Sequence, residues 1–493
     1  MKKMILCAAA LLFGVVVYGQ DIVGSPTSAL VPALPGAAAG ANTGESIQNG
    51  NDNKVRVRQA GTSQSVYTNQ NDGSGTGGNQ AWVRQTGAVQ ATSGVENATD
   101  ILQSGSANQA QTRQEGDYNN AVTRQGQNND ASARNKAKIR QGTGNQAQDN
   151  RAAIDQDGDD NLAQTQQTYD NSDAWTIQNG TANKSMIVQD AGPNQTDGHE
   201  ALNWQNGEGN ESAINQSGAG ARNIAQAGQN GDFNQAKQLQ TTDAVSGGTG
   251  NRANVVQGLG GAISTVGVTN DLWVEVINNV DGDANPITGN VPSRYNKAVQ
   301  IQSGNAQDAG IFQFGGTFGP SNYGEQIQAG SGNRGSIVQA QIIVGGVNGD
   351  NYAKQYQDGS SNNAGMVQEG NGMKALQDQR GNSSDALSYQ SGRDHLLNIH
   401  QRGDDNVAYS TQHGLGNSAL MVQDGGHSYS VQQNKDLAQF DVSAGGNQAD
   451  ILQLGPNGDF ATDGIDCDFD APMDLTMDYS IPDFDLGDVC PDC

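Results

Sequence analysis

An 11-residue repeat runs through the middle of the chain and restricts its fold more than any other feature. From residue 347 to residue 423, a Gln recurs at every eleventh position. Every unit but the first has a Gly nine residues before its Gln, and most have an Ala four residues before it. Because a fixed period of this kind marks repeat architectures, we expect one small structural unit to be stacked many times along an axis.

Within the unit, x-G-x-x-N-x-A-x-x-x-Q, selected residues alternate with variable ones. Positions 5, 7, 9 and 11 hold Asn, Ala, a small or aliphatic residue and Gln, whereas positions 6, 8 and 10 are mixed. A period of two is typical of a β-strand with one selected face. We therefore expect the selected positions to face inward and position 10 to be exposed, as at Tyr389, His400 and Thr411. The Gly at position 2 supplies the backbone freedom of a tight turn.

This pattern predicts an all-β fold, a β-solenoid of stacked strand-turn-strand rungs. Two 11-residue units form one rung of about 22 residues, and parallel rungs stack about 4.8 Å apart with about 10 Å between facing sheets. Inward Asn and Gln side chains then lie above their equivalents, where amides hydrogen-bond along the axis. The predicted ladder residues are Gln357, Asn362, Gln368, Gln379, Gln390, Gln401, Asn406, Gln412, Asn417 and Gln423. The predicted turn glycines are Gly359, Gly370, Gly381, Gly392, Gly403 and Gly414.

Six segments follow from the composition. We predict a signal peptide at 1–19, a flexible Gly/Ala/Pro leader at 20–45, solenoid repeats at 46–240, an irregular insertion at 241–294, further repeats at 295–458 and an acidic, Cys-containing tail at 459–493. Lys2 and Lys3 followed by a short apolar run are typical of a cleaved secretory signal. Cys7 lies near the start of this run and not after it, so we expect no lipid anchor. The run is too short to span a bilayer comfortably, so we expect no membrane anchor either.

Charge and cysteine content limit the partners that the chain can have. After Gly458 there are eleven Asp and no Lys or Arg, as in a solvated acidic tail. Cys490 and Cys493 could form a disulfide, a metal clip or a redox pair, and export favours the disulfide. The net charge of −26 disfavours nucleic acid as a partner, since attraction to phosphate needs a basic surface.

The Gly, Asn, Ala and Gln of each unit, at these spacings, resemble the curlin repeat of curli-type bacterial functional amyloids. The likeness extends over residues 46–453 and is clearest at 347–423. In that family, subunits polymerise into extracellular fibres used in biofilm and adhesion. The resemblance implies a secreted protein, extracellular or on a bacterial cell surface, that self-associates into fibres. It also implies other curlin-like subunits and an outer-membrane export pore as partners. The chain departs from the family in its length, in residues 241–294 and in its acidic tail.

Three classes of function fit such a chain to different degrees. The first is a curlin-like amyloid fibre subunit or fibre-associated component, and the second is a monomeric β-solenoid adhesin or stalk with capped ends. The third, a β-helix enzyme acting on polysaccharide, should present a cluster of Asp, His, Lys or Arg, and the sequence suggests none. We therefore predict a structural protein that is not an enzyme and holds neither a cofactor nor a metal.

Two groups of residues remain open to more than one interpretation. His395, His400, His413 and His427 fall at different positions of the unit, so we expect them to be scattered over the surface and not to share a metal. The unit-ending Gln is immediately preceded by an arginine in five units, and Trp residues also fall at outward positions. Such side chains could bind polysaccharide or pack neighbouring fibres together, or they could reflect strand preference alone. The five arginines are Arg58, Arg84, Arg113, Arg124 and Arg140.

Overall fold

The computed structural model describes residues 40–72, 77–86, 94–126, 132–142, 147–193, 198–242, 249–258, 293–314, 322–340, 350–434, 437 and 442–455. The predicted signal peptide, the leader up to residue 39, residues 243–248 and 259–292 of the predicted insertion, and the predicted acidic tail, 459–493, lie outside these residues. Cys490 and Cys493 therefore lie outside them as well. Across the described ranges all regular elements are β-strands, and the part of the chain described holds no helix long and apolar enough to cross a membrane.

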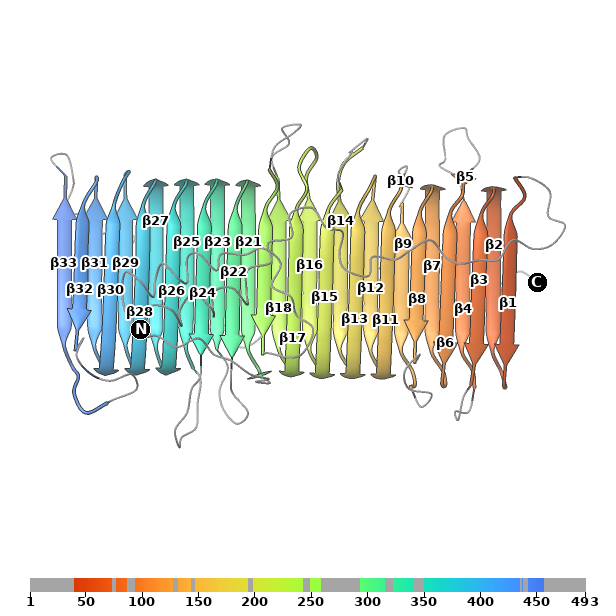
Figure 1. Ribbon diagram of the computed structural model, residues 1–493, viewed down its shortest axis with the longest axis horizontal. Coiled ribbons are helices and arrows are strands. Elements are labelled where there is room, and N and C mark those ends of the chain that lie inside the picture. Colours follow the sequence, from red (N-terminus) through yellow and green to blue (C-terminus); the bar gives the residue numbers. More distant parts are fainter. Residues whose placement is uncertain are drawn as a thin grey trace, which may run out of the picture. The chain divides into compact units, whose positions relative to one another are not determined.

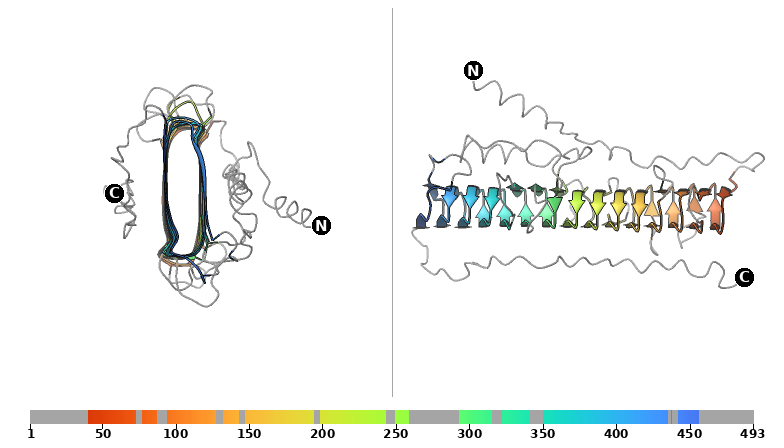
Figure 2. Two further views of the ribbon diagram at one scale, coloured as in Figure 1. Left: turned by 90° about the vertical axis from the view of Figure 1, so that its left-hand side faces the viewer. Right: turned by 90° about the horizontal axis from the view of Figure 1, so that it is seen from below.

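Two units divide the chain, one built on Gly19–Ala227 and the other on Gly228–Gln240 and Gly250–Thr476. We call them the N-terminal and the C-terminal unit. Within each unit the strands lie side by side in two sheets that face one another as flat layers (Figures 1 and 2). Apart from the two-residue strands, consecutive strands of the chain belong alternately to the two sheets.

The N-terminal unit contains two sheets of parallel strands. Its first sheet runs in the order β1 (Thr43–Asn49), β3 (Ser65–Asn71), β6 (Ala98–Ser104), β8 (Asn120–Gln125), β11 (Arg151–Asp159), β13 (Asp173–Thr181) and β15 (Glu200–Glu208). Its second sheet contains β2 (Lys54–Thr62), β4 (Gln80–Thr86), β7 (Gln109–Asp117), β9 (Lys136–Gln141), β12 (Leu162–Thr168), β14 (Lys184–Asp190) and β16 (Glu211–Ser217). The two-residue strands β5 (Gly94–Val95) and β10 (Ala147–Gln148) pair with β2 and β7.

The C-terminal unit repeats this arrangement. Its first sheet contains β17 (Ile224–Asp232), which begins just before the unit boundary, then β19 (Arg252–Gln257), β22 (Asp308–Phe314), β24 (Arg334–Ala340), β26 (Asn363–Asn371), β28 (Asp385–Arg393), β30 (Val407–Leu415) and β32 (Ser428–Gln433). Its second sheet contains β18 (Gln235–Thr241), β21 (Lys297–Asn305), β23 (Tyr323–Ser331), β25 (Tyr352–Ser360), β27 (Lys374–Asn382), β29 (Leu396–Arg402), β31 (Ser418–Asp424) and β33 (Gln448–Leu454). The short β20 (Ser293–Arg294) pairs with β17.

The strand register confirms the predicted β-solenoid. All the pairs in each sheet are parallel, and equivalent residues of successive rungs lie directly opposite each other. Between β25 and β27, Gln357 pairs with Gln379, which lies 22 positions further along the chain. Between β21 and β23, Gln300 pairs with Gln326, and the separation is 26 positions. The register of the strands is kept although the number of residues between them differs.

The interior of each unit is narrow because small side chains fill the column at position 7. Ala121, Ala152 and Ala375 are fully buried, and the next inward position holds a larger side chain such as Ile139 or Ile154. Ala and Ile side chains from both sheets pack together in this column, as do Val and Ile near the start of the N-terminal unit. The period of two therefore does separate an inner from an outer face.

The predicted exposure of position 10 is wrong in the C-terminal unit. Tyr389, His400 and Thr411 do point away from the interior, but each is at most 3% exposed. On the outer face of the first sheet, Tyr389 belongs to an apolar cluster with its register partner Val367 and with Val338. Alternation distinguishes the two faces of a strand, but it does not tell which outer faces are covered.

The stretch predicted as an irregular insertion, 241–294, contains the six-residue strand β19 and, at its end, the short β20. β19 pairs in register with β22, and Gln257 lies opposite Gln313. This strand ends just before residue 259, where the described residues stop. The solenoid pattern therefore continues into this stretch before the sequence loses its period.

Candidate assembly site: amide ladders and open edges

Inward Gln side chains form continuous hydrogen-bonded ladders along each sheet of the C-terminal unit. The Nε2 of Gln357 donates to the Oε1 of Gln379 at 2.9 Å, and Gln379 donates in the same way to Gln401 at 2.9 Å. In the second sheet the ladder consists of Gln240, Gln302, Gln328, Gln357, Gln379, Gln401, Gln423 and Gln453. In the first sheet it consists of Gln229, Gln257, Gln313, Gln339, Gln368, Gln390, Gln412 and Gln433.

The same amides also join the two sheets. Besides its ladder bond, the Nε2 of Gln379 donates to the carbonyl of Asn363 in β26, at 2.9 Å, and to the carbonyl of Ser384 at 2.8 Å. Gln368 reaches back in the same way to the carbonyl of Tyr352 in β25. A buried amide with these partners is satisfied without water, which explains how a polar residue can occupy the most regular interior position.

A further Gln ladder escaped the sequence interpretation. At position 9 of the second sheet, Gln238, Gln300, Gln326, Gln355 and Gln377 donate in series from one rung to the next at 2.8–3.0 Å. We expected small or aliphatic residues at this position. The sequence does contain a signal for it, because Gln-x-Gln occurs in five successive strands of this sheet, β18, β21, β23, β25 and β27.

The Asn column works differently from the Gln ladders. The Oδ1 of Asn362 accepts the backbone N–H of Ser384 in the next rung at 3.0 Å, and its Nδ2 donates to the carbonyl of Gly381 at 2.8 Å. Asn417 likewise accepts the backbone N–H of Asn447. The side chain therefore ties the turn of one rung to that of the next. Among the predicted residues, Asn406 donates within its own turn, to the carbonyls of Arg402 and Gly403.

All six predicted turn glycines have positive φ angles. The values are 120° for Gly359, 134° for Gly370, 137° for Gly381, 124° for Gly392, 74° for Gly403 and 102° for Gly414. Glycines of successive rungs stack so closely that a Cβ on Gly381 would overlap the carbonyl of Gly403. Two residues further on, most turns contain a second left-handed residue, such as Ser383 or Asp405. The sequence interpretation had not assigned that second position.

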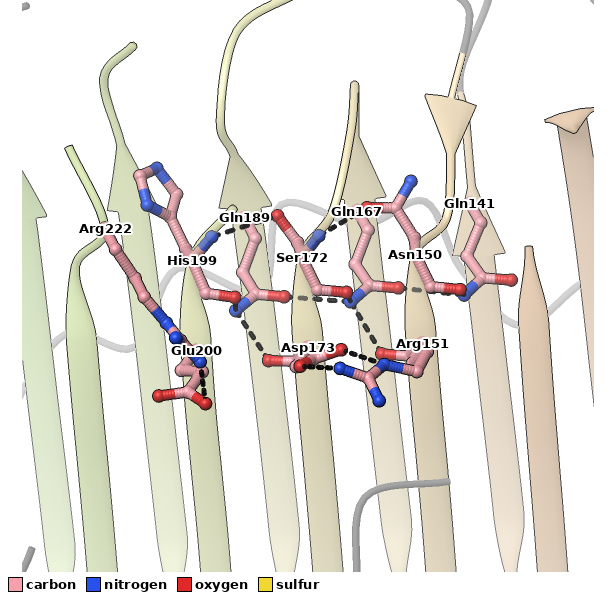
Figure 3. Close-up of polar contacts among 10 residues, drawn as sticks. All are labelled: Gln141, Asn150, Arg151, Gln167, Ser172, Asp173, Gln189, His199, Glu200 and Arg222. Carbon is pink, nitrogen blue, oxygen red and sulfur yellow. Dashed lines mark hydrogen bonds and ion pairs between the residues drawn. The ribbon is translucent and has the colours of Figure 1, made fainter. Parts of the chain in front are cut away.

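Figure 3 shows the corresponding arrangement in the N-terminal unit. Gln141, Gln167 and Gln189 donate in series at 2.9 and 3.0 Å. On the outer face, ion pairs join successive rungs: Arg151 contacts Asp173 through two bonds of 2.7 Å. Arg222 pairs with Glu200 in the same way. The outer faces of these rungs therefore place opposite charges on neighbouring strands.

Histidine takes the place of Asn in the Asn column at His199, His395 and His427, and the first two reproduce the Asn contacts. The Nδ1 of His199 accepts the backbone N–H of Asn223 at 3.3 Å, while its Nε2 donates to the carbonyl of Asp190 at 3.2 Å. The Nδ1 of His395 similarly accepts the backbone N–H of Asn417 at 3.2 Å. The predicted surface location is therefore wrong for His395, and also for His400 and His413, which are each 3% exposed. Within the described ranges no three His, Cys, Asp or Glu side chains converge as they would around a metal ion.

We expect His199 to make the N-terminal unit sensitive to acid. Burial lowers its pKa from 6.5 to about 4, although hydrogen bonds to backbone carbonyls oppose this shift. The unfolded chain therefore takes up a proton near pH 6.5 and the folded chain only near pH 4. Stability from this residue is complete above pH 6.5 and is lost as the pH falls towards 4, by about 2–3 kcal/mol. His199→Asn keeps an acceptor for Asn223 and removes the titration. Denaturant unfolding at pH 7.5 and pH 4.5 should show a smaller loss for this variant than for the wild type, whereas equal losses would contradict the assignment.

The first strand of the N-terminal unit, β1, and the last first-sheet strand of the C-terminal unit, β32, have open edges. Among the described residues, β1 pairs only with β3, and β32 pairs only with β30. In the first rung the inward side chains of Ser46 and Gln48 are exposed. In β32, Tyr429 is 39% exposed, whereas its register partner Ala408 is fully buried. Both edges thus present the interior column of the solenoid to the outside.

The ladders have a direction, which makes the two edges complementary. Throughout both units the Nε2 of the earlier rung donates to the Oε1 of the later rung. In the described part of the chain, the Oε1 of Gln48 and of Gln59 receives no Gln donor, while both residues donate onward to Gln70 and Gln85. At the other edge, Gln433 and Gln453 accept from Gln412 and Gln423, and their Nε2 atoms contact only backbone carbonyls. One edge offers acceptors and the other offers donors.

A comparison with protein families matches one segment of this ladder region. Residues 392–425 match the family model described as the curlin associated repeat. This segment contains β29, β30 and β31 with five of the predicted ladder residues, Gln401, Asn406, Gln412, Asn417 and Gln423. None of the curated proteins compared with the chain matches it. The chain therefore carries the curlin associated repeat, and it does so in the segment where the rungs are most regular.

Proposed function

We propose that the protein is a secreted structural protein, a curlin-like subunit of an amyloid fibre or a component of such a fibre, that serves cell adhesion and the biofilm matrix. In this proposal it is not an enzyme. The fibre grows when the β32/β33 edge of one copy stacks on the β1/β2 edge of the next, in the parallel register used within each unit.

The observation that carries this proposal is the polarity of the Gln ladders at the open edges. Stacking would let Gln433 and Gln453 of one copy donate to Gln48 and Gln59 of the next, so that both ladders continue across the junction. It would also cover Tyr429, which is partly exposed at the edge. Unpaired strand edges template the addition of further strands, and in-register amide stacking stabilises amyloid.

Seeded assembly tests the proposal. The mature chain, residues 20–493, should form fibres after dilution from denaturant, with thioflavin-T fluorescence and a meridional reflection near 4.8 Å. Preformed fibres should shorten the lag phase. A stable β-rich monomer that is never seeded would contradict the proposal and would favour a monomeric adhesin or stalk.

A single proline at the open edge gives a sharper test. Thr43 directs its backbone N–H to the carbonyl of Gln64. Since successive residues of a strand direct their backbone groups to opposite edges, Ser46 directs its N–H to the open side. Ser46→Pro should therefore leave the pairing of β1 with β3 largely intact and abolish seeded growth, because the junction loses a backbone donor. Ser46→Ala is the matched control and should grow like the wild type. Wild-type growth of Ser46→Pro would show that this edge is not the junction.

A further inference from the structure

A column of arginines lies on the outer face of the second sheet in the N-terminal unit. Arg58 of β2, Arg84 of β4, Arg113 of β7 and Arg140 of β9 are successive register partners. At about 4.8 Å per rung, the four side chains start within about 14 Å along the axis. Like charges on directly opposite residues of neighbouring strands repel each other.

The surrounding residues strengthen this positive charge. The outward positions of the same four strands also hold Lys54, Arg56, Lys136 and Lys138, so eight of the 26 Lys and Arg of the chain gather here, although Lys138 is only 5% exposed. The acidic residues in these strands are Glu115 and Asp117, both at the end of β7. We call this set of eight cations the basic column.

Other outer faces of the same unit avoid this arrangement. There, cations lie opposite acids of the next rung, as with Arg151 and Asp173 at 2.7 Å or Lys184 and Glu211 at 2.8 Å. In the basic column, Glu115 pairs with Arg113, whereas burial and the charge of Arg113 lower the pKa of Arg140. This face therefore has more cations than acids, whereas the chain as a whole has 52 acidic residues and only 26 Lys and Arg.

We infer that the acidic C-terminal segment of the same chain, residues 456–493, docks on the basic column. This segment holds eleven Asp and no Lys, Arg or Glu, so its charge is opposite to that of the column. Several of its Asp residues alternate, as at Asp466, Asp468 and Asp470, which places carboxylates about every 6.6 Å on one side of an extended chain. Fully extended, the segment spans up to about 125 Å, far more than the roughly 14 Å of the four arginines.

Covalent attachment favours this occupant over other polyanions. Binding of a tethered segment is intramolecular, so a free polymer has to compete against its effective concentration. A second copy of the same face would bring a further basic column and is repelled. The docked segment neutralises the column and keeps external polyanions, such as acidic polysaccharides, away from it.

Zero-length cross-linking on the full chain tests this docking. A carbodiimide should join the exposed Lys54 and Lys136 to Asp residues of the segment 456–493, as read by mass spectrometry of the monomer at low concentration. Arg58→Gln, Arg84→Gln, Arg113→Gln and Arg140→Gln combined should lower the yield at least tenfold. The control variant, with Lys237, Lys297, Lys354 and Lys374 all changed to Gln, has the same change in charge and should keep the yield. Absence of these cross-links in the wild type would overturn the inference.

A mixture of isotopically labelled and unlabelled chains identifies the source of the segment. Cross-linked peptides should be either both labelled or both unlabelled, whereas mixed pairs would assign the docked segment to a second copy and overturn the inference. These measurements are made on the unpolymerised protein, so their outcome does not depend on whether fibres form.

Competition with a probe polymer provides an independent readout. When the eleven Asp of the segment are changed to Asn in the full chain, poly-L-glutamate should bind at least tenfold more tightly than to the wild type. Adding the four Arg→Gln changes should remove this gain. Equal affinity of poly-L-glutamate for the wild type and the Asp→Asn variant would show that the column is open to external polyanions and that the inference is wrong.

Discussion

Replacing Gln379 by Leu should lower the free energy of unfolding by about 3–6 kcal/mol, because the change removes four hydrogen bonds at a fully buried position. Gln379 accepts from Gln357 and donates to Gln401 and to the carbonyls of Asn363 and Ser384. Leu has a similar volume but can take none of these roles. The Oε1 of Gln401 then loses its donor, and the Nε2 of Gln357 keeps only the carbonyls of Arg334 and Asn362 as acceptors. Guanidinium unfolding of the monomer, followed by circular dichroism, measures the loss.

A substitution on the other face of the same strand is the control for this prediction. Lys374 lies in β27 with an exposed side chain, and Lys374→Gln should change the stability by no more than about 0.5 kcal/mol. Because stacked repeats contact mainly their neighbours, the damage from Gln379→Leu should be concentrated in β25, β27 and β29 and should appear there as faster amide exchange. Equal stability of the two variants would mean that the ladder does not stabilise the fold.

The inner face was predictable because its requirements are the same in every rung. A buried amide column works only if each rung supplies an amide, so Gln379 and its equivalents recur without exception from residue 357 to residue 423. The parallel register and the length of the regular rung follow from that period. Where a rung is longer, as between Ala298 and Gly324, the strands still keep their register.

The Asn column was less predictable because side chains other than Asn can make the same hydrogen bond. What the next rung needs is an acceptor for a backbone N–H. The Oδ1 of Asn362, the Oγ of Ser384 and the Nδ1 of His395 all provide one. The sequence therefore shows a relaxed position where the structure shows a recurring hydrogen bond. For the same reason, His395, which we expected on the surface, belongs to the interior.

Outer faces follow no common requirement, and there the sequence interpretation failed. Tyr389 and Arg113 both occupy position 10, yet Tyr389 is 1% exposed and packs in an apolar cluster, while the side chain of Arg113 is 30% exposed and pairs with Glu115. The alternating pattern predicts only whether a side chain points inward or outward. Whether an outward side chain has apolar or charged neighbours depends on which strands pair with its own strand.

Two of the turn glycines allow the cost of a left-handed backbone to be measured separately from the cost of a steric overlap. Gly381 has a φ of 137° and would place a Cβ against the carbonyl of Gly403 in the next rung. Gly416 has a φ of 61°, and a Cβ there would have no heavy atom within 4 Å. Both positions are unfavourable for Ala, but only Gly381 adds an overlap with backbone atoms, which cannot turn aside as a flexible side chain would.

Gly381→Ala should therefore destabilise the C-terminal unit by about 3 kcal/mol or more, since a backbone region reserved for Gly and a steric overlap act together. Gly416→Ala should cost only about 1 kcal/mol, the strain of a left-handed Ala, and Gly416→Asn should cost less still, because Asn tolerates that conformation. Denaturant unfolding of the three variants under one condition gives the comparison. If Gly381→Ala were no worse than Gly416→Ala, the rungs would have moved apart to accept the methyl group, and close stacking of the turns would not be a requirement of the solenoid.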